Sequence, residues 1–290
     1  MSNTDLIIEE RSRDIGDFLV GRLIPFRKKR MVGPFIFIDH MGPSTIKPGH
    51  YLDIGQHPHI GLSTLTYLLE GEIEHRDTLG TKQRVSAGSV GWMTAGKGIV
   101  HTERTPKDLR DGREMVMHGY QIWVALPKER ELMEPQFSYT KAEELPLWKE
   151  DGLEFKLVAG EGFGRKSPVP VFSELFMVDI RSKEKAPLSI SGQLKGEIGI
   201  CIVSGYIEAC SERIEQGNML VSKEDDICSI MLGENTHVLL FGGIPFPEER
   251  YIYWNFVASN KELIEKAKDD WKQRKFSLLK DDESYIALPQ

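Results

Sequence analysis

Cysteine is scarce in this chain, which has three among 290 residues. Cys201, Cys210 and Cys228 are odd in number, lie in the second half and form no Cys-x-x-Cys pair. A disulfide framework is therefore not expected, because such frameworks use an even and closely spaced set of cysteines. This number and spacing of cysteines favours reduced, buried thiols in an intracellular protein.

Positive charge is in deficit, and long apolar runs are missing. The chain has 37 Lys and Arg against 44 Asp and Glu, for a net charge of −7. That balance argues against general binding of nucleic acid or anionic lipid, which needs clustered positive charge. No run approaches the roughly 18 apolar residues of a membrane span, and the first residues resemble no signal peptide. We therefore expect a cytoplasmic protein that contacts neither membrane nor nucleic acid directly.

Short β-rich runs, separated by turns that contain glycine, dominate both halves of the sequence. In the first half they cover residues 35–38, 62–69, 71–76 and 120–125. In the second half they cover residues 154–159, 175–180, 198–203, 206–210, 218–221, 227–231, 238–241 and 251–257. Closely spaced strands predict a sandwich or barrel. The pattern predicts an all-β fold with two jelly-roll barrels related by duplication.

Two short pairs in the first half carry ligating groups at strand spacing: His57 with His59, and His101 with Glu103. Successive side chains on a strand point to opposite faces, so the members of each pair share a face. The first pair alone fits hydrogen-bonded histidines equally well. The second pair follows a glycine-rich turn at residues 94–98, which can aim the next strand into the barrel. Together the pairs predict a site for a divalent transition metal, with positions left for substrate or dioxygen.

The other histidines receive no metal role. We interpret His40, His50, His75 and His118 as loop or strand-end residues, one of which could orient a ligating imidazole from outside the ligand set. Asp39 and Gln121 are candidate polar groups of a pocket. The second half has one histidine, His237, so it cannot repeat the site.

The domain boundaries follow from these patterns. We expect residues 1–135 to form an N-terminal metal-binding barrel. Residues 150–290 should form a second barrel without a metal site, followed by a C-terminal helix. Residues 127–152 are rich in Glu, Lys and Pro, and we expect a linker with one helical turn. The helix should begin at a capping box of Ser259 and Glu262 and continue through Lys275 with an apolar face.

Several motifs give the chain a family resemblance. They are Gly33-Pro34-Phe35 through Asp39, His57-Pro58-His59, Thr66 through Gly71, Glu74-His75-Arg76-Asp77, Trp92 through Gly96, Gly98 through Glu103, and Gln121 through Val124. A chain with these motifs resembles the pirins of the cupin superfamily. The match covers about the first 130 residues closely and the rest more loosely. One departure is the stretch 60–64, which lacks the acidic residue that cupins often carry after His-x-His.

The resemblance implies a bicupin that holds one metal ion, Fe(II) first and Zn, Ni or Mn as alternatives, at His57, His59, His101 and Glu103. It also implies quercetin 2,3-dioxygenase chemistry, in which a flavonol or similar enolic substrate reacts with O2. Glu103 would take the proton of the substrate hydroxyl, and ring cleavage would release carbon monoxide. Other pirins resemble regulators, so an iron-binding protein that acts through a protein partner is the alternative. A bicupin isomerase or storage protein with another metal is a third.

Overall fold

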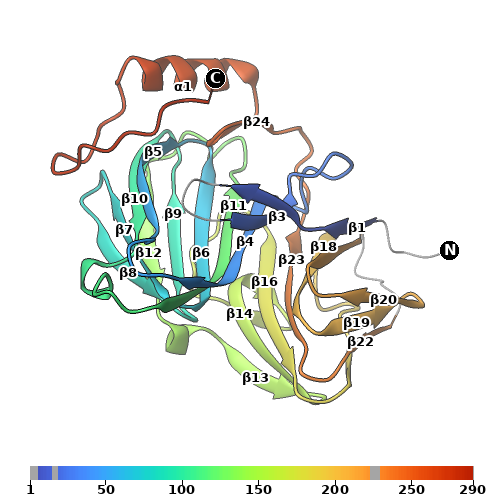
Figure 1. Cartoon of the computed structure of the whole chain (residues 1–290). Helices are drawn as coiled ribbons and strands as arrows, with labels where there is room; N and C mark the ends of the chain where they lie inside the picture. The colour runs from blue at the N-terminus through green and yellow to red at the C-terminus, as the bar shows by residue number, and fades with distance from the viewer. Residues whose placement is uncertain (1–5, 15–18, 223–228, 290) are drawn as a thin grey trace. The chain divides into compact units, whose positions relative to one another are not determined.

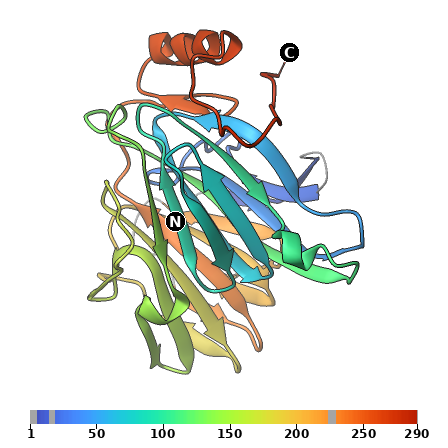
Figure 2. The same ribbon diagram turned by 90° about the vertical axis from the view of Figure 1, so that its left-hand side faces the viewer.

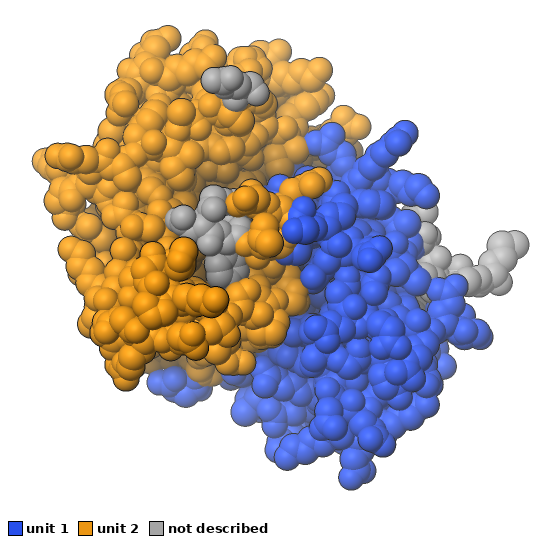
Figure 3. Space-filling model, in the orientation of Figure 1, with its two compact units in different colours: residues 1–12, 21–38, 143–246 blue, residues 13–20, 39–142, 247–290 orange. Residues whose placement is uncertain are grey.

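The computed structural model of the chain describes residues 6–14, 19–222 and 229–289. Figure 1 shows an all-β protein with one α-helix near its C-terminus, as the sequence predicts. The chain divides into two compact units, which Figure 3 shows in different colours. Unit 1 comprises residues 1–12, 21–38 and 143–246, and unit 2 comprises residues 13–20, 39–142 and 247–290. The units therefore alternate along the chain. The ranges 1–135 and 150–290 stay a prediction for the two cupin domains.

Unit 1 is built from two antiparallel sheets. The larger has the strand order β1-β21-β18-β23-β16-β14-β13, with β15 paired to β14, and the smaller has the order β17-β22-β19-β20. These strands are β1 (Leu6–Glu9), β13 (Leu147–Glu150), β14 (Leu153–Gly162), β15 (Arg165–Lys166), β16 (Leu175–Ser182), β17 (Ala186–Leu188), β18 (Glu197–Ser204), β19 (Tyr206–Ala209), β20 (Glu212–Glu215), β21 (Asn218–Ser222), β22 (Ile230–Leu232) and β23 (His237–Gly243). Their inward side chains form one apolar core that includes Leu157, Phe176 and Leu240.

Unit 2 also has two main sheets. One has the order β5-β10-β7-β8, and in the other β12-β9-β6-β11 is continued by β4, β3 and β2. The strands are β5 (Asp53–His59), β6 (Leu62–Glu70), β7 (Glu72–Asp77), β8 (Lys82–Ser86), β9 (Val90–Thr94), β10 (Ile99–Arg104), β11 (Met115–Ala125) and β12 (Gln136–Thr140). Three further strands contribute residues to both units: β2 (Arg11–Asp14), β3 (Leu19–Ile24) and β4 (Phe35–Ile46).

The C-terminal part of unit 2 closes one end of its sheets. It contains a small hairpin of β24 (Tyr251–Tyr253) and β25 (Phe256–Ala258), then helix α1 (Lys261–Lys272). Figures 1 and 2 show α1 at one end of the sheets, and Figure 1 labels β5 at that end. Ile264, Ala267 and Trp271 form the buried face of the helix, as its apolar spacing predicts.

The helix boundaries correct two details of the sequence prediction. Asn260 caps the N-terminus by accepting a hydrogen bond from the Leu263 amide, because Ser259 is engaged instead with buried Glu131. The helix ends at Lys272 rather than Lys275. A short polar side chain that accepts from the third helical amide satisfies a donor that would otherwise have no partner.

The prediction that residues 127–152 form a linker is wrong, although the one helical turn expected there is present as the 3₁₀ turn Ala142–Glu144. The segment is not a linker because it contributes a strand to a sheet of each unit. It contains β12, which pairs with β9 through Phe137 opposite Met93, and β13, which pairs with β14. Two 3₁₀ turns, Lys107–Leu109 and Ala142–Glu144, complete the elements. The sequence of this segment is polar because β12 and β13 both lie at sheet edges and expose one face.

The cysteines depart in part from expectation. Cys201 is a buried free thiol, and burial raises its pKa well above the ordinary value. Cys210 is disulfide-bonded, so the expectation of reduced thiols throughout is wrong there. Cys228, like the start of the predicted run 227–231, lies outside the described residues. Across the described ranges no helix is long and apolar enough to cross a membrane.

Candidate metal centre

Strands β5 and β10 lie side by side and carry the predicted ligands. Their antiparallel register places His101 opposite His57 and Ile99 opposite His59. Directly opposite residues share a face of the sheet, and so do residues two apart on one strand. The turn before β10 depends on Gly96, which has a φ of +51° and whose added Cβ would lie 2.0 Å from the Met133 carbonyl oxygen. Glycine is required there to bring β10 beside β5.

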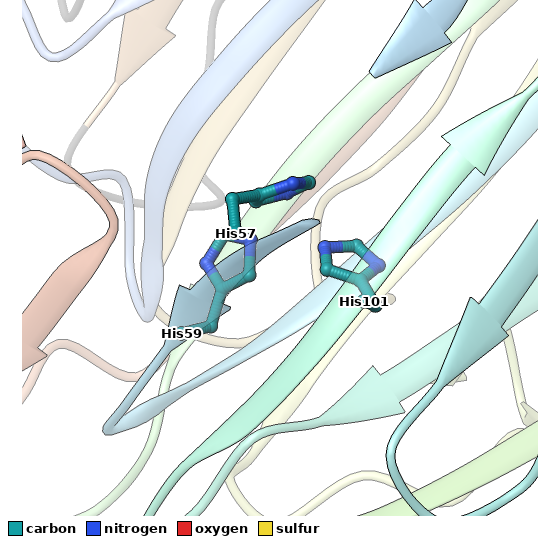
Figure 4. Close-up of side chains that lie close together, drawn as sticks. All are labelled: His57, His59 and His101. Carbon is teal, nitrogen blue, oxygen red and sulfur yellow. The ribbon is translucent and has the colours of Figure 1, made fainter. Parts of the chain in front are cut away.

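The three imidazoles meet inside unit 2. His57, His59 and His101 are 6%, 2% and 0% exposed, and one ring nitrogen from each lies within 4.8 Å of those of the other two. Figure 4 shows the three side chains turned toward one another from β5 and β10. The sequence prediction that these pairs converge is correct for the histidines.

The hydrogen bonds indicate which ring nitrogens are available to a metal ion. His57 donates from Nδ1 to the Gly55 carbonyl oxygen at 2.8 Å, which leaves its Nε2 as the acceptor. His59 Nδ1 and His101 Nε2 are buried and have no hydrogen-bond partner among the described residues. Because buried polar atoms in folded proteins are rarely left unpaired, these nitrogens fit the ligand set of an ion. Imidazole donors suit divalent transition metals without fixing which one.

Burial keeps the cluster neutral. It lowers the pKa of His57 from 6.5 to about 4, against an opposing hydrogen bond to Gly55. Burial, reinforced by the neighbouring imidazoles, also holds the pKa of His59 and His101 well below 6.5. Neutral imidazole is the form that binds metal, so no proton competes for these donors near neutral pH.

Glu103 lies beyond the group of nitrogens within 4.8 Å of one another, although it is on the same strand as His101. Between His101 and Glu103 the pairing with β5 shifts by one residue, which is a β-bulge. The carboxylate is buried, and its Oε1 accepts a hydrogen bond from the Thr66 hydroxyl at 3.3 Å. Burial raises the pKa of Glu103, partly offset by His75 and Thr66. Glu103 therefore lies beside the three histidines and is not part of the group of converging nitrogens.

His75 is the histidine that contacts the cluster from outside. It lies on β7, where its Nδ1 is 3.3 Å from His101 Nδ1 and its Nε2 is 2.9 Å from Asp77 Oδ2. If His101 presents Nε2 to an ion, its Nδ1–H donates to His75, whose Nε2–H donates to Asp77. Phe137 stacks on the His75 ring at 4.3 Å. Sequence reasoning did not select His75 among four histidines, although His75 and Asp77 show the same two-residue spacing.

The other candidates do not belong to the group of converging nitrogens. His40 and His118 approach each other at 2.9 Å between their Nε2 atoms, and His50 is exposed. Gln121 lies close to the site, with its side-chain oxygen 3.0 Å from the Thr66 hydroxyl. Trp123 contacts His59 edge to face at 5.1 Å. Aromatic and amide groups thus border the histidines on the β11 side.

The chain is similar to known proteins over most of its length. The family profile described as Pirin matches residues 18–124, and that of the Pirin C-terminal cupin domain matches residues 177–277. A pirin-like protein of Caulobacter vibrioides is 43% identical, with 99% of each chain covered. Pirin of Rattus norvegicus is 31% identical, with 93% of this chain and 91% of that protein covered. The crystal structure of a quercetin 2,3-dioxygenase from Acinetobacter baumannii is 34% identical, with a TM-score of 0.88 and coverage of 98% and 95%.

Proposed function

The chain belongs to the pirin family of bicupins, and on that premise we propose that it is a metal-dependent dioxygenase of the quercetin 2,3-dioxygenase type. Its substrates are a flavonol or a similar enolic compound and O2. The observation that carries the proposal is the convergence of three buried, neutral imidazoles beside a buried carboxylate. The structural likeness to a quercetin 2,3-dioxygenase supports the reaction class.

We assign His57, His59, His101 and Glu103 as the residues that hold the ion. Fe(II) is the metal that we expect, and Zn, Ni and Mn share the same donor chemistry. When bound, the metal supplies Lewis acidity toward the enolic oxygen and the redox chemistry that reaction with O2 requires. His75 and Asp77 hold the His101 ring so that its Nε2 faces the ion, as partners of ligating histidines do.

Glu103 is the group that we assign to proton transfer. Its carboxylate takes the proton of the substrate hydroxyl, and the Thr66 hydroxyl at 3.3 Å keeps the carboxylate oriented. The ligands are at most 6% exposed. Exclusion of water from such a site strengthens each charge interaction and protects reactive species from hydrolysis.

Turnover with quercetin tests the proposal. We expect protein loaded anaerobically with Fe(II) to consume quercetin and O2 and to release carbon monoxide. Glu103→Gln, which keeps the shape and removes the proton acceptor, should lower the rate by about a hundredfold or more. Glu70→Gln, at the exposed end of β6, is the control and should leave the rate unchanged.

Absence of O2 uptake with every flavonol would contradict the proposal. Recovery of a stoichiometric protein partner from cells, together with that absence, would favour the iron-binding regulator. A cytoplasmic location stays a prediction, which fractionation of cells would check.

A further inference from the structure

The segment that follows α1 returns to β5 at the residue next to a proposed ligand. Gln56, which precedes His57, is 1% exposed, and its side-chain amide is fully used by this segment. Its Nε2 donates to the carbonyl oxygens of Asp282 at 2.7 Å and Ser284 at 3.1 Å, and its Oε1 accepts from the Leu279 amide at 2.6 Å. We call residues 279–286 the C-terminal strap.

The strap also pairs with the backbone of β5 at the β-bulge, where β5 is the edge strand of its sheet. The ladder between β5 and β10 resumes at Ile54 after His57, so Gly55 and Gln56 together oppose the single residue Thr102. The Gln56 amide donates to the Ser284 hydroxyl at 2.9 Å, and the Ile286 amide donates to the Gln56 carbonyl at 3.0 Å. A bulge re-aims the adjacent side chain, and it persists only if its free backbone groups find partners.

The approach of the strap to the bulge is close. A Cβ added to Gly55 would lie 2.9 Å from the Cβ and Oγ of Ser284. The carbonyl of this same Gly55 accepts the hydrogen bond from His57 Nδ1. The strap therefore contacts the outer side of the segment Gly55-Gln56. On the inner side, the Gly55 carbonyl of the same segment orients the imidazole of His57.

The neighbouring ligand strand is held by the same strap. Arg104 follows Glu103 on β10, and its guanidinium donates to Asp282 Oδ2 at 2.6 Å and to Ser284 Oγ at 2.9 Å. Since side chains alternate along a strand, Gln56 and Arg104 point away from the cluster, whereas His57 and Glu103 point toward it. Ser284 thus links the outer faces of both ligand strands.

We propose that the C-terminal strap is a positioning element of the metal site. It fixes the bulge at Gln56, and through the bulge it fixes His57, while its contacts with Arg104 hold the strand that carries Glu103. The inference rests on metal binding at this cluster, as given under the proposed function, and not on the reaction catalysed. Because coupling between two sites is reciprocal, bound metal must in turn strengthen the docking of the strap.

Metal affinity of strap variants tests the proposal. Cobalt(II) is the probe, because its visible absorption reports the ligands around it, and competition with a chelator gives its affinity. We expect Gln56→Ala and Ser284→Ala to weaken cobalt binding about tenfold, as loss of partners outside the ligand set commonly does. The cobalt spectrum of both variants should also change. Ser284→Ala removes the hydroxyl and its hydrogen bonds to Gln56, Arg104 and Asp282, while the Cβ and the apolar side chains of the strap stay in place.

Asp281→Ala is the matched control. Asp281 lies in the strap beside Asp282, but it is exposed and pairs with Arg76 on β7, a strand that carries none of the proposed ligands. It should bind cobalt within about twofold of the unaltered protein, because exposed ion pairs contribute little. Hydrogen exchange at the Ile286 amide should slow when cobalt is added.

Two outcomes overturn the inference, and they can be told apart. Equal cobalt affinity in Gln56→Ala, Ser284→Ala and the unaltered protein would overturn the role of the strap while leaving the metal site intact. Failure of the unaltered protein to bind cobalt at all would overturn the site and the inference together.

Discussion

The two units differ in what their interiors contain. The core of unit 1 is apolar, with Leu, Ile, Val and Phe side chains from both of its sheets. The interior of unit 2 contains buried His57, His59 and His101 beside buried Glu103, and among the described residues these three histidines are the one potential metal cluster. The same architecture of two facing sheets therefore supports a core cluster of apolar side chains in unit 1 and a group of buried histidines in unit 2.

The difference separates what the fold needs from what the site needs. Burial of apolar side chains stabilises a barrel by about 1.5–3 kcal/mol for each large residue. Buried imidazoles and a carboxylate oppose folding unless they are paired or bind an ion. Unit 1 forms its apolar core cluster without any group of converging histidines among its described residues. The cost of burying imidazoles is the reason why we interpret the histidines of unit 2 as a metal site rather than as a source of stability.

The largest expected effect on stability comes from unit 1. Leu157 is fully buried in its core, and Leu157→Ala should lower the free energy of unfolding by about 2–5 kcal/mol. It should leave the number of metal ions bound per folded chain unchanged. Chemical denaturation and metal analysis measure the two quantities. Leu147→Ala, at a 59% exposed position of β13, should change stability by no more than about 0.5 kcal/mol.

Low pH should affect the two units in different ranges. The pKa of His57 is about 4 in the folded protein and 6.5 when exposed, so below pH 6.5 the unfolded chain binds the proton first. Stability therefore falls as the pH drops from 6.5 to about 4, by about 3 kcal/mol for His57 alone. Denaturation of metal-free protein at several pH values measures this loss.

In unit 1 the buried carboxyl group of Asp179 has a shifted pKa, which lies below that of His57. Burial alone would raise the pKa of Asp179, but His237 at 2.9 Å and the charge of Arg181 outweigh it and hold the pKa below the ordinary 3.8. Its contribution is present above pH 3.8 and is lost only at more acidic pH. A stability that stays constant from pH 6.5 down to 4 would contradict the account of buried, neutral histidines in unit 2.

A smaller effect is expected from His75, which contacts a ligand without joining the cluster. His75→Ala removes the group between His101 and Asp77 and should weaken metal binding about 10- to 100-fold. His50→Ala, at an exposed position of the same unit, serves as the control. Titration with cobalt(II) measures both, and equal affinities would show that the His101 ring is held by other contacts.

Much of the architecture follows from the sequence, because period-two alternation and glycine turns are local signals. The runs at 62–69 and 175–180 appear as β6 and β16. The exchange of segments between units is not local. Strand β1 joins unit 1 by pairing with β21, more than 200 residues along the chain. The local sequence around β1 contains no signal for a partner so far along the chain. The assignment of separate chain segments to the same unit could therefore not be predicted.

The site shows the same limit. Strand spacing placed His57 and His59 on one face of β5, and the register of β5 against β10, with His101 opposite His57, brings the three histidines together. The role of His75 depends on the register between β7 and β10, which sets His101 opposite Asp77 and Glu103 opposite His75. The role of Gln56 depends on a bulge and on a segment more than 220 residues away. Neither register nor bulge can be deduced from alternation alone.

The stoichiometry of bound metal tests the central claim most directly. Purification without chelator, followed by quantification of iron, zinc, nickel and manganese, should find one ion per chain in the unaltered protein. The same value is expected for His237→Ala, which removes the histidine of β23 in unit 1. His101→Ala should retain no tightly bound ion. One equivalent of metal in His101→Ala, or its loss in His237→Ala, would contradict the assignment of the site to unit 2.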